Sequence, residues 1–157
     1  MNPYHRWLAP ILWVGVLVNF TFCVGVFLAP EWLVSWFCWP ALLFPFSGDA
    51  VTGRCVPWTG ETVWIRDAGA LLAMLGVMYW AAASDPLRYR VNAWVFVVNK
   101  MFFAVFWVWP VLFAGAAWGF MALGVIDFTL GLLVWIFLAR LLAYERDKAV
   151  PGAAEGA

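Results

Sequence analysis

Two side chains of opposite charge lie inside long apolar stretches of this sequence. Lys100 lies within the run 91–113 and Asp127 within the run 118–142. Thirteen residues separate Lys100 from Phe113 and thirteen separate Ala114 from Asp127, so an antiparallel hairpin at the short turn Gly115-Ala116-Ala117 would bring both to similar depth. A charge at the middle of a bilayer is costly and is usually kept because it is paired or functional. The sequence therefore predicts that this pair has a role inside the membrane.

Two interpretations of the pair remain open. Lys100 and Asp127 could form a structural ion pair that fixes helix register, adding little net stability but costly to break on one side only. Alternatively, they could bind a polar head group or relay protons, as intramembrane ionisable residues often do. Because helix side chains lean toward their own N-terminus, the pair needs a favourable register, an inserted water or partners on other subunits. Asn19, at the middle of the first apolar run, is expected to join them as an intramembrane polar cluster.

The composition defines the class of protein that must position these residues. The 157 residues are 66% hydrophobic and 11% charged, with mean hydropathy +0.89, which excludes a soluble domain with a polar exterior. The 9 Lys and Arg residues together balance the 9 Asp and Glu residues, so the chain has no excess of positive charge to bind nucleic acid. The sole histidine, His5, precedes the first apolar run, so two intramembrane histidines cannot hold a haem here. We expect no metal and no cofactor bound by this chain alone, with a quinone or lipid as the ligands left open.

The apolar runs predict an all-α fold, a bundle of four transmembrane helices. Each run is about as long as the roughly 20 residues that cross a bilayer. Asp85-Pro86 should end the second span, because proline lacks an N–H and restricts the residue before it. Residues 1–148 should form a single membrane domain followed by a flexible tail at 149–157. The predicted spans are 8–28, 63–83, 91–113 and 118–142.

The basic residues predict an orientation with both termini in the cytoplasm. With the N-terminus inside, only Arg54 and Arg66 fall outside, and this asymmetry follows the positive-inside rule. We therefore expect an integral protein of the bacterial cytoplasmic (inner) membrane. The basic residues that would be cytoplasmic are Arg6, Arg88, Arg90, Arg140, Arg146 and Lys148.

The long external connection between the first two spans is rich in tryptophan. Residues 30–39 carry an aromatic stripe at helical spacing and are too short to span, which predicts an interfacial helix on the outer leaflet. The connection either caps the bundle or forms a docking surface or lid over a lipid-soluble ligand. Cys38 and Cys55 both lie there, on the side where a disulfide can form. The tryptophans of this predicted docking loop are Trp32, Trp36, Trp39, Trp58 and Trp64.

Glycines mark the helix faces that can approach one another closely. Gly124 and Gly131 share one helical face with Asp127, and Gly69 and Gly76 share a face of the second span. Small residues let neighbouring helix backbones come close in a membrane. The sequence therefore predicts tight helix contacts at these two faces.

Three short segments carry a resemblance to a known family. Ala29-Pro30 precedes an amphiphilic segment, Arg66-Asp67-Ala68-Gly69 leads into the second span, and Asp85-Pro86-Leu87-Arg88-Tyr89-Arg90 precedes the third. With these features the chain resembles small bacterial DoxX-like four-helix membrane proteins over most of residues 8–142. The resemblance implies a four-helix bundle and, for some members, association with quinone-linked or thiol oxidoreductases. It implies no catalytic residue set.

Three functional hypotheses follow. The first is a non-catalytic accessory or structural subunit of a larger membrane protein complex, such as a respiratory or other electron-transfer assembly, embedded in lipid beside other membrane subunits. The second is a small membrane protein that binds or transports a lipid or quinone. The third is a membrane-embedded enzyme that uses Lys100 or Asp127 to donate or accept protons, which requires a desolvated, titrating group. A cavity that reaches Lys100 from the lipid would favour the second hypothesis over the first.

Overall fold

The computed structural model describes residues 3–30, 63–113 and 119–149, and within these ranges the regular structure is helical. All four helices are long and apolar enough to cross a membrane. This confirms the all-helical class and the expectation of four spanning helices. The helices are α1 (Pro3–Leu28), α5 (Val63–Ser84), α6 (Arg90–Phe113) and α7 (Gly119–Ala149).

The helix bounds follow the predicted spans except at the two ends nearest the termini. α1 begins at Pro3 rather than residue 8, because proline suits the first helical turn, where its missing N–H has no helical partner. α7 continues past residue 142 to Ala149. Arg146 and Lys148 lie in its last turn, where positive charge is favoured by the helix dipole. The charged residues that follow the apolar part of α7 therefore continue the helix.

A tight turn at Asp85-Pro86 separates α5 from α6, as predicted. The Arg88 amide donates to Asp85 Oδ1 at 3.0 Å, and the Tyr89 amide donates to the Asp85 carbonyl at 3.0 Å. Asp85 thus caps the chain that leads into α6, while Pro86 supplies the fixed backbone angle that a helix start favours. The turn reverses the chain within a few residues.

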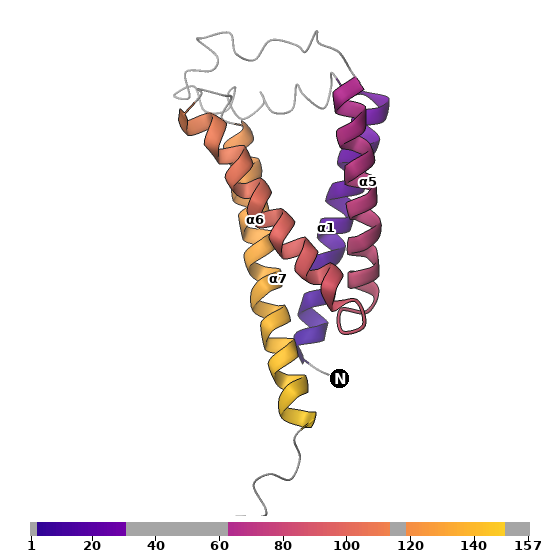
Figure 1. The fold of residues 1–157 in the computed structure, drawn as a ribbon, viewed down its shortest axis with the longest axis vertical. Helices are drawn as coiled ribbons and strands as arrows, with labels where there is room; N and C mark the ends of the chain where they lie inside the picture. The colour runs from indigo at the N-terminus through magenta and orange to yellow at the C-terminus, as the bar shows by residue number, and fades with distance from the viewer. Residues whose placement is uncertain (1–2, 31–62, 114–118, 150–157) are drawn as a thin grey trace, which may run out of the picture.

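The helices form two antiparallel pairs, α1 with α5 and α6 with α7, and each pair is packed along its length more extensively than the pairs are packed on each other. We call them the first and second hairpins. We call the end that carries the α5–α6 turn and the start of α1 the basal end, and the opposite end, with Leu28 and Phe113, the distal end. The two hairpins meet near the basal end and diverge toward the distal end (Figure 1).

The buried apolar core lies in the basal half, where the hairpins meet. It combines the first half of α1 and the first turns of α6 with the last turns of α5 and the second half of α7, so all four helices contribute. The rings of Tyr79 and Phe96 pack against each other at its centre, with centroids 4.5 Å apart and planes inclined at 55°. Its members are Leu8, Leu12, Val16, Tyr79, Ala82, Ala83, Ala93, Phe96, Val97, Val134, Leu138 and Leu141.

Glycines allow the close approaches on which this packing depends. A Cβ on Gly69 would lie 2.9 Å from Val26, and one on Gly76 would lie 3.1 Å from Phe20, so the predicted close face of α5 packs against α1. On α7, a Cβ on Gly124 would lie 3.1 Å from the Ala104 carbonyl oxygen. The two predicted glycine faces therefore hold together the first and the second hairpin, respectively.

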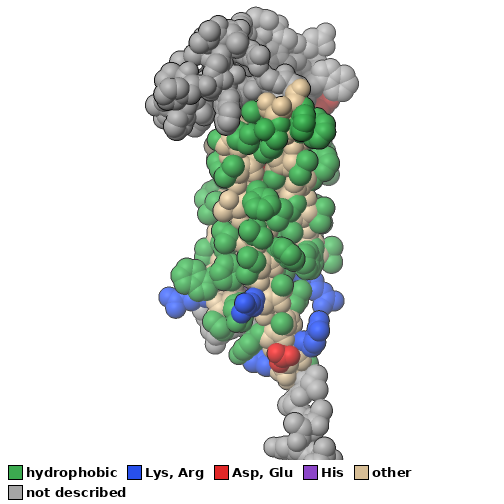
Figure 2. All heavy atoms as spheres, turned by 90° about the vertical axis from the view of Figure 1, so that its left-hand side faces the viewer, with side chains coloured by type: hydrophobic (Ala, Val, Ile, Leu, Met, Phe, Trp, Pro, Cys, Tyr) green, Lys and Arg blue, Asp and Glu red, His purple; other side chains and the backbone are tan. Residues whose placement is uncertain are grey.

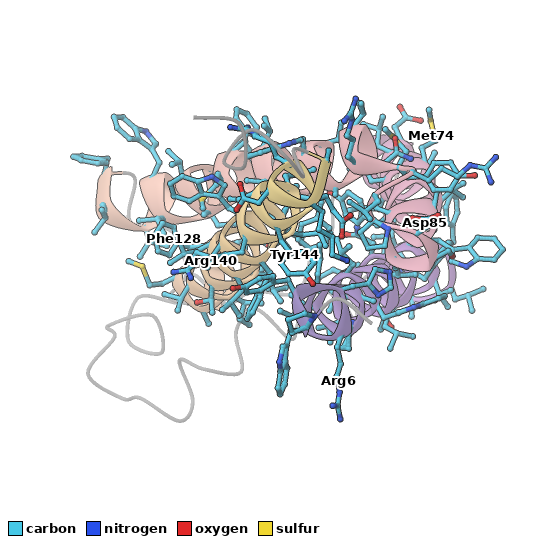
Figure 3. The ribbon with its side chains drawn as sticks, turned by 90° about the horizontal axis from the view of Figure 1, so that it is seen from below. Arg6, Met74, Asp85, Phe128, Arg140 and Tyr144 are labelled. Carbon is cyan, nitrogen blue, oxygen red and sulfur yellow. The ribbon has the colours of Figure 1, made fainter. Side chains whose placement is uncertain are left out.

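The outer surface is apolar along the helices and basic at one end. Figure 2 shows hydrophobic side chains covering the second hairpin, with Lys and Arg side chains gathered toward the basal end. Seen from that end, Arg6 points away from the bundle (Figure 3). Tyr144 of α7 packs edge-on against Tyr4 of α1, with centroids 6.3 Å apart, and joins the two hairpins there.

Candidate functional site

Five polar side chains meet at the distal limit of the core, and all four helices contribute. α1 supplies Asn19, α5 supplies Tyr79, α6 supplies Asn99 and Lys100, and α7 supplies Asp127. We call this group the polar cluster. Three of its members are buried, with exposed fractions of 3% for Asn19, 4% for Lys100 and 8% for Asp127, whereas Asn99 is half-buried. The structure therefore brings together the three residues that the sequence singles out.

Lys100 and Asp127 form a direct ion pair inside the second hairpin. Lys100 Nζ donates to Asp127 Oδ1 at 2.6 Å, and 5% and 11% of the two side chains are exposed. At this short distance and in apolar surroundings, a charge-assisted hydrogen bond is strong. Each charge has its counter-charge on the neighbouring helix of the same hairpin.

The register of α6 against α7 makes the pair possible. A Cβ on Gly131 would lie 3.1 Å from the Cβ of Lys100, so Lys100 starts level with Gly131, not with Asp127. Asp127 lies four residues before Gly131, roughly 6 Å further toward the distal end at 1.5 Å per residue. The long lysine side chain covers this offset. The predicted equality of depth is thus replaced by an offset of about one helical turn.

Tyr79 and Asn99 link the two hairpins beside the ion pair. Asn99 Nδ2 donates to the Tyr79 hydroxyl at 2.6 Å, and the Tyr79 ring is fully buried against Phe96. Two turns earlier on α6, Asn92 Nδ2 donates to the Met78 carbonyl at 3.3 Å. Two asparagines seven residues apart therefore fasten α6 to α5 from one face.

Asn19 is the incompletely bonded member of the cluster. Its side chain interacts with the Tyr79 hydroxyl, which also lies close enough to Asp127 to feel its charge. Asn19 Nδ2 nevertheless has no hydrogen-bond partner among the described residues. A buried amide that keeps an unused donor is uncommon in folded proteins. This atom has hydrogen-bonding capacity available to a ligand.

An apolar groove of about 410 Å³ runs along the distal half of the second hairpin. Neither Lys100 nor Asp127 lines it, so this groove does not reach the ion pair. Its nearest walls, Ala104 and Gly124, lie one turn distal to those two residues on α6 and α7. We call it the distal groove. Its walls are Ala104, Val105, Val108, Trp109, Leu112, Phe113, Gly124, Val125 and Phe128.

Sequence reasoning did not assign Tyr79 and Asn99 to the site. Tyrosine is enriched at membrane interfaces, which gives no reason to expect its hydroxyl at the middle of a bundle. Two signals were present: Tyr79 lies three residues after Gly76, and Asn99 lies seven after Asn92, which is one helical face. Polar residues at helical spacing within a span therefore mark a contact with a neighbouring helix.

Other candidate residues lie apart from the cluster or outside the described residues. Cys23 is a free, buried thiol in α1, as expected for a small apolar residue. Within residues 3–30, 63–113 and 119–149 no group of three His, Cys, Asp or Glu side chains is placed to hold a metal. Beyond residue 30, the predicted interfacial helix at 30–39 lies outside the described residues. So do the predicted Cys38–Cys55 disulfide and the side chains of Trp32, Trp36, Trp39, Trp58 and Trp64.

The chemistry open to the cluster is recognition of a small polar group in an apolar setting. It offers one cation, one carboxylate, two amides and a phenol, with the two charges neutralised against each other. Such a group of donors and acceptors can orient a ligand by hydrogen bonds. No protein-family model, no curated protein and no solved structure matches this chain.

Proposed function

We propose that this chain is a non-catalytic accessory subunit of a larger membrane protein complex, of the kind that serves respiratory or other electron transfer. The distal groove carries the proposal. Its walls are wholly apolar and include the aromatic side chains of Trp109, Phe113 and Phe128. A groove of this shape between two helices accepts side chains of a third helix, and large aromatic residues dominate the energetics of such contacts.

The ion pair supports a structural role for the four helices themselves. Lys100 and Asp127 neutralise each other within the chain, so neither charge requires a partner subunit to be tolerated in hydrocarbon. A closed pair of this kind fixes how α6 and α7 are aligned. It thereby holds the two walls of the distal groove in one register.

We place the protein in the bacterial cytoplasmic membrane with both termini on the cytoplasmic side. The basic side chains at the basal end support this orientation, since cytoplasmic ends carry the excess of Lys and Arg. The resemblance to DoxX-like membrane proteins supports an assembly with an oxidoreductase. The proposed orientation and the proposed assembly both build on the four helices that are long and apolar enough to cross a membrane.

A second candidate function is the binding of a lipid or quinone. The unused donor of Asn19 favours it, because a polar head group could accept that hydrogen bond. The distal groove would equally hold an acyl or isoprenoid chain, since its lining is apolar throughout. The two candidates differ in what accompanies the purified protein.

Purification from native membranes in a mild detergent, followed by mass spectrometry of proteins and lipids, tests the proposal. We expect other membrane subunits in fixed stoichiometry. The variant Val105→Trp, which narrows the groove, should lose them, whereas Val98→Trp should keep them. Val98 and Val105 are each 66% exposed on α6, seven residues apart, but only Val105 lines the groove.

A purified chain that carries no other protein would refute the accessory role. A stoichiometric lipid or quinone in its place would establish the second candidate. Loss of partners in both valine variants alike would show that the contact does not depend on the distal groove.

A further inference from the structure

Asn19 Nδ2 and Asp127 leave complementary hydrogen-bonding capacity in the polar cluster. Asn19 is 3% exposed, and its amide nitrogen has no partner among the described residues. An amide nitrogen of asparagine can donate two hydrogen bonds. The cluster therefore contains at least one donor that is shielded from solvent and available.

Asp127 offers the matching acceptor. Only its Oδ1 receives the Lys100 ammonium, and 11% of its side chain remains exposed. An ionised carboxylate has two oxygens and about four acceptor positions, so one ammonium does not exhaust it. Asp127 can accept a further hydrogen bond without giving up Lys100.

The donor and the acceptor both interact with the Tyr79 hydroxyl. The Asn19 side chain on α1 interacts with the Tyr79 hydroxyl, and the charge of Asp127 on α7 acts on the same group, so both hairpins contribute. A ligand atom beside that hydroxyl would meet an amide N–H on one side and a carboxylate on the other. Carbonyl and ether oxygens can only accept, and an ammonium can only donate, whereas a hydroxyl oxygen does both.

The apolar groove nearest to the ion pair lies on its distal side. Apart from Tyr79, the core members lie on the basal side, whereas the distal groove begins one turn beyond Lys100 and Asp127, at Ala104 and Gly124. An apolar tail attached to a hydroxyl would extend distally, among apolar side chains, at no cost in buried polar groups.

We propose that the polar cluster binds an O–H group, which accepts a hydrogen bond from Asn19 Nδ2 and donates one to the Asp127 carboxylate. Two sources share this chemistry: an internal water molecule and the head group of a long-chain alcohol. The site goes beyond the accessory role, because it needs no partner subunit.

A thermal-unfolding titration in the hydroxyl-free detergent lauryldimethylamine oxide tests the alcohol. The probe is 1-hexadecanol, and its control is 1-methoxyhexadecane, which has the same chain but cannot donate. At hexadecanol concentrations above those that saturate the site, we expect the unfolding midpoint to rise in proportion to the logarithm of the hexadecanol concentration. The ether should leave the midpoint unchanged. In the variant Asn19→Leu the alcohol shift should disappear.

Nuclear magnetic resonance of protein labelled with ¹⁵N at asparagine tests the water. The Asn19 side-chain amide signal should show a cross-peak to a long-lived water. The signal is assigned by its loss in Asn19→Leu or, if that variant does not fold, in Asn19→Thr. An alcohol shift identifies an alcohol site, and a water cross-peak without that shift identifies a hydration site. Absence of both effects in the wild-type chain overturns the proposal, as does an equal response to the ether.

Discussion

Lys100 lies level with Gly131 and reaches its counter-charge on Asp127 about one helical turn away. The Cβ of Lys100 lies 3.1 Å from the position of a Cβ on Gly131, and its Nζ lies 2.6 Å from Asp127 Oδ1. The missing glycine side chain lets the lysine stem run along α7 instead of being pushed away from it. The ion pair thus depends on a third residue that carries no charge.

Breaking the ion pair on one side should destabilise the protein more than removing both charges. We expect Asp127→Asn to cost about 3–5 kcal/mol of unfolding free energy, because it leaves the Lys100 ammonium buried without a counter-charge. The double change with Lys100→Met should cost less. Titration with dodecyl sulfate in mixed micelles, followed by tryptophan fluorescence, measures both. Equal losses in the single and the double variant would contradict a stabilising pair.

A side chain at Gly131 should uncouple the pair without altering either charge. We expect Gly131→Val to lower the unfolding free energy by about 1–3 kcal/mol, the usual penalty for overpacking, by pushing Lys100 from α7. The coupling energy between Lys100 and Asp127 in a double-mutant cycle should fall toward zero in this background. Ala122→Val, at an exposed site on the same helix, serves as control and should keep the coupling. Full coupling retained in Gly131→Val would show that the register does not matter.

Gly15 should tolerate no side chain while Phe96 occupies its present place. A Cβ on Gly15 would collide with the Phe96 ring, which is fully buried and packed against Tyr79, so it cannot move aside. We expect Gly15→Ala to destabilise the chain by about 1–3 kcal/mol. Phe96→Leu added to Gly15→Ala should cost less than the sum of the two separate changes. Strict additivity in the melting experiment would argue against this contact.

Removal of the Tyr79 hydroxyl should weaken the link between the hairpins by a small amount. We expect Tyr79→Phe to cost about 0.6 kcal/mol, and at most about 1.7, as for other hydrogen bonds between helices in membranes. The change removes the 2.6 Å bond from Asn99 and the interaction of the hydroxyl with Asn19. Tyr89→Phe, in the exposed α5–α6 turn, should have no effect on the same unfolding titration. A neutral Tyr79→Phe would mean that Asn99 finds another partner.

The basal end should be accessible only from the cytoplasm. In a background with Cys23, Cys38 and Cys55 replaced, a cysteine at the exposed turn residue Leu87 should resist an impermeant maleimide in intact cells. The same cysteine should react after the membrane is permeabilised. Labelling of Leu87→Cys in intact cells would reverse the orientation proposed from the basic residues.

The sequence was sufficient to predict the helices, because uninterrupted apolar runs and one Asp-Pro turn leave few alternatives in a membrane. It also indicated the glycine faces at Gly69, Gly76 and Gly124, since small residues at helical spacing have few other uses within a span. The extension of α7 beyond residue 142 was not predicted, because hydropathy marks where a helix leaves the bilayer and not where its hydrogen bonds stop.

The composition of the polar cluster could be predicted only in part. Buried charge is expensive, so Lys100 and Asp127 were conspicuous, and the depth of Asn19 placed it with them. Tyr79 and Asn99 form a hydrogen bond whose partners lie 20 residues apart on different helices. Its formation depends on how far α5 and α6 slide past each other, and no pattern within one helix encodes that offset.

The location of both charges within the second hairpin affects how the chain can enter the membrane during synthesis. A lone lysine or aspartate helix would resist transfer from the translocon into lipid, but α6 and α7 inserted together present a neutral unit. The first hairpin, which contains no charge at that depth among its described residues, could partition earlier and independently. Assembly would then consist of the association of two preformed hairpins, and the hydrogen bonds of Asn99 and Asn92 between them would form last.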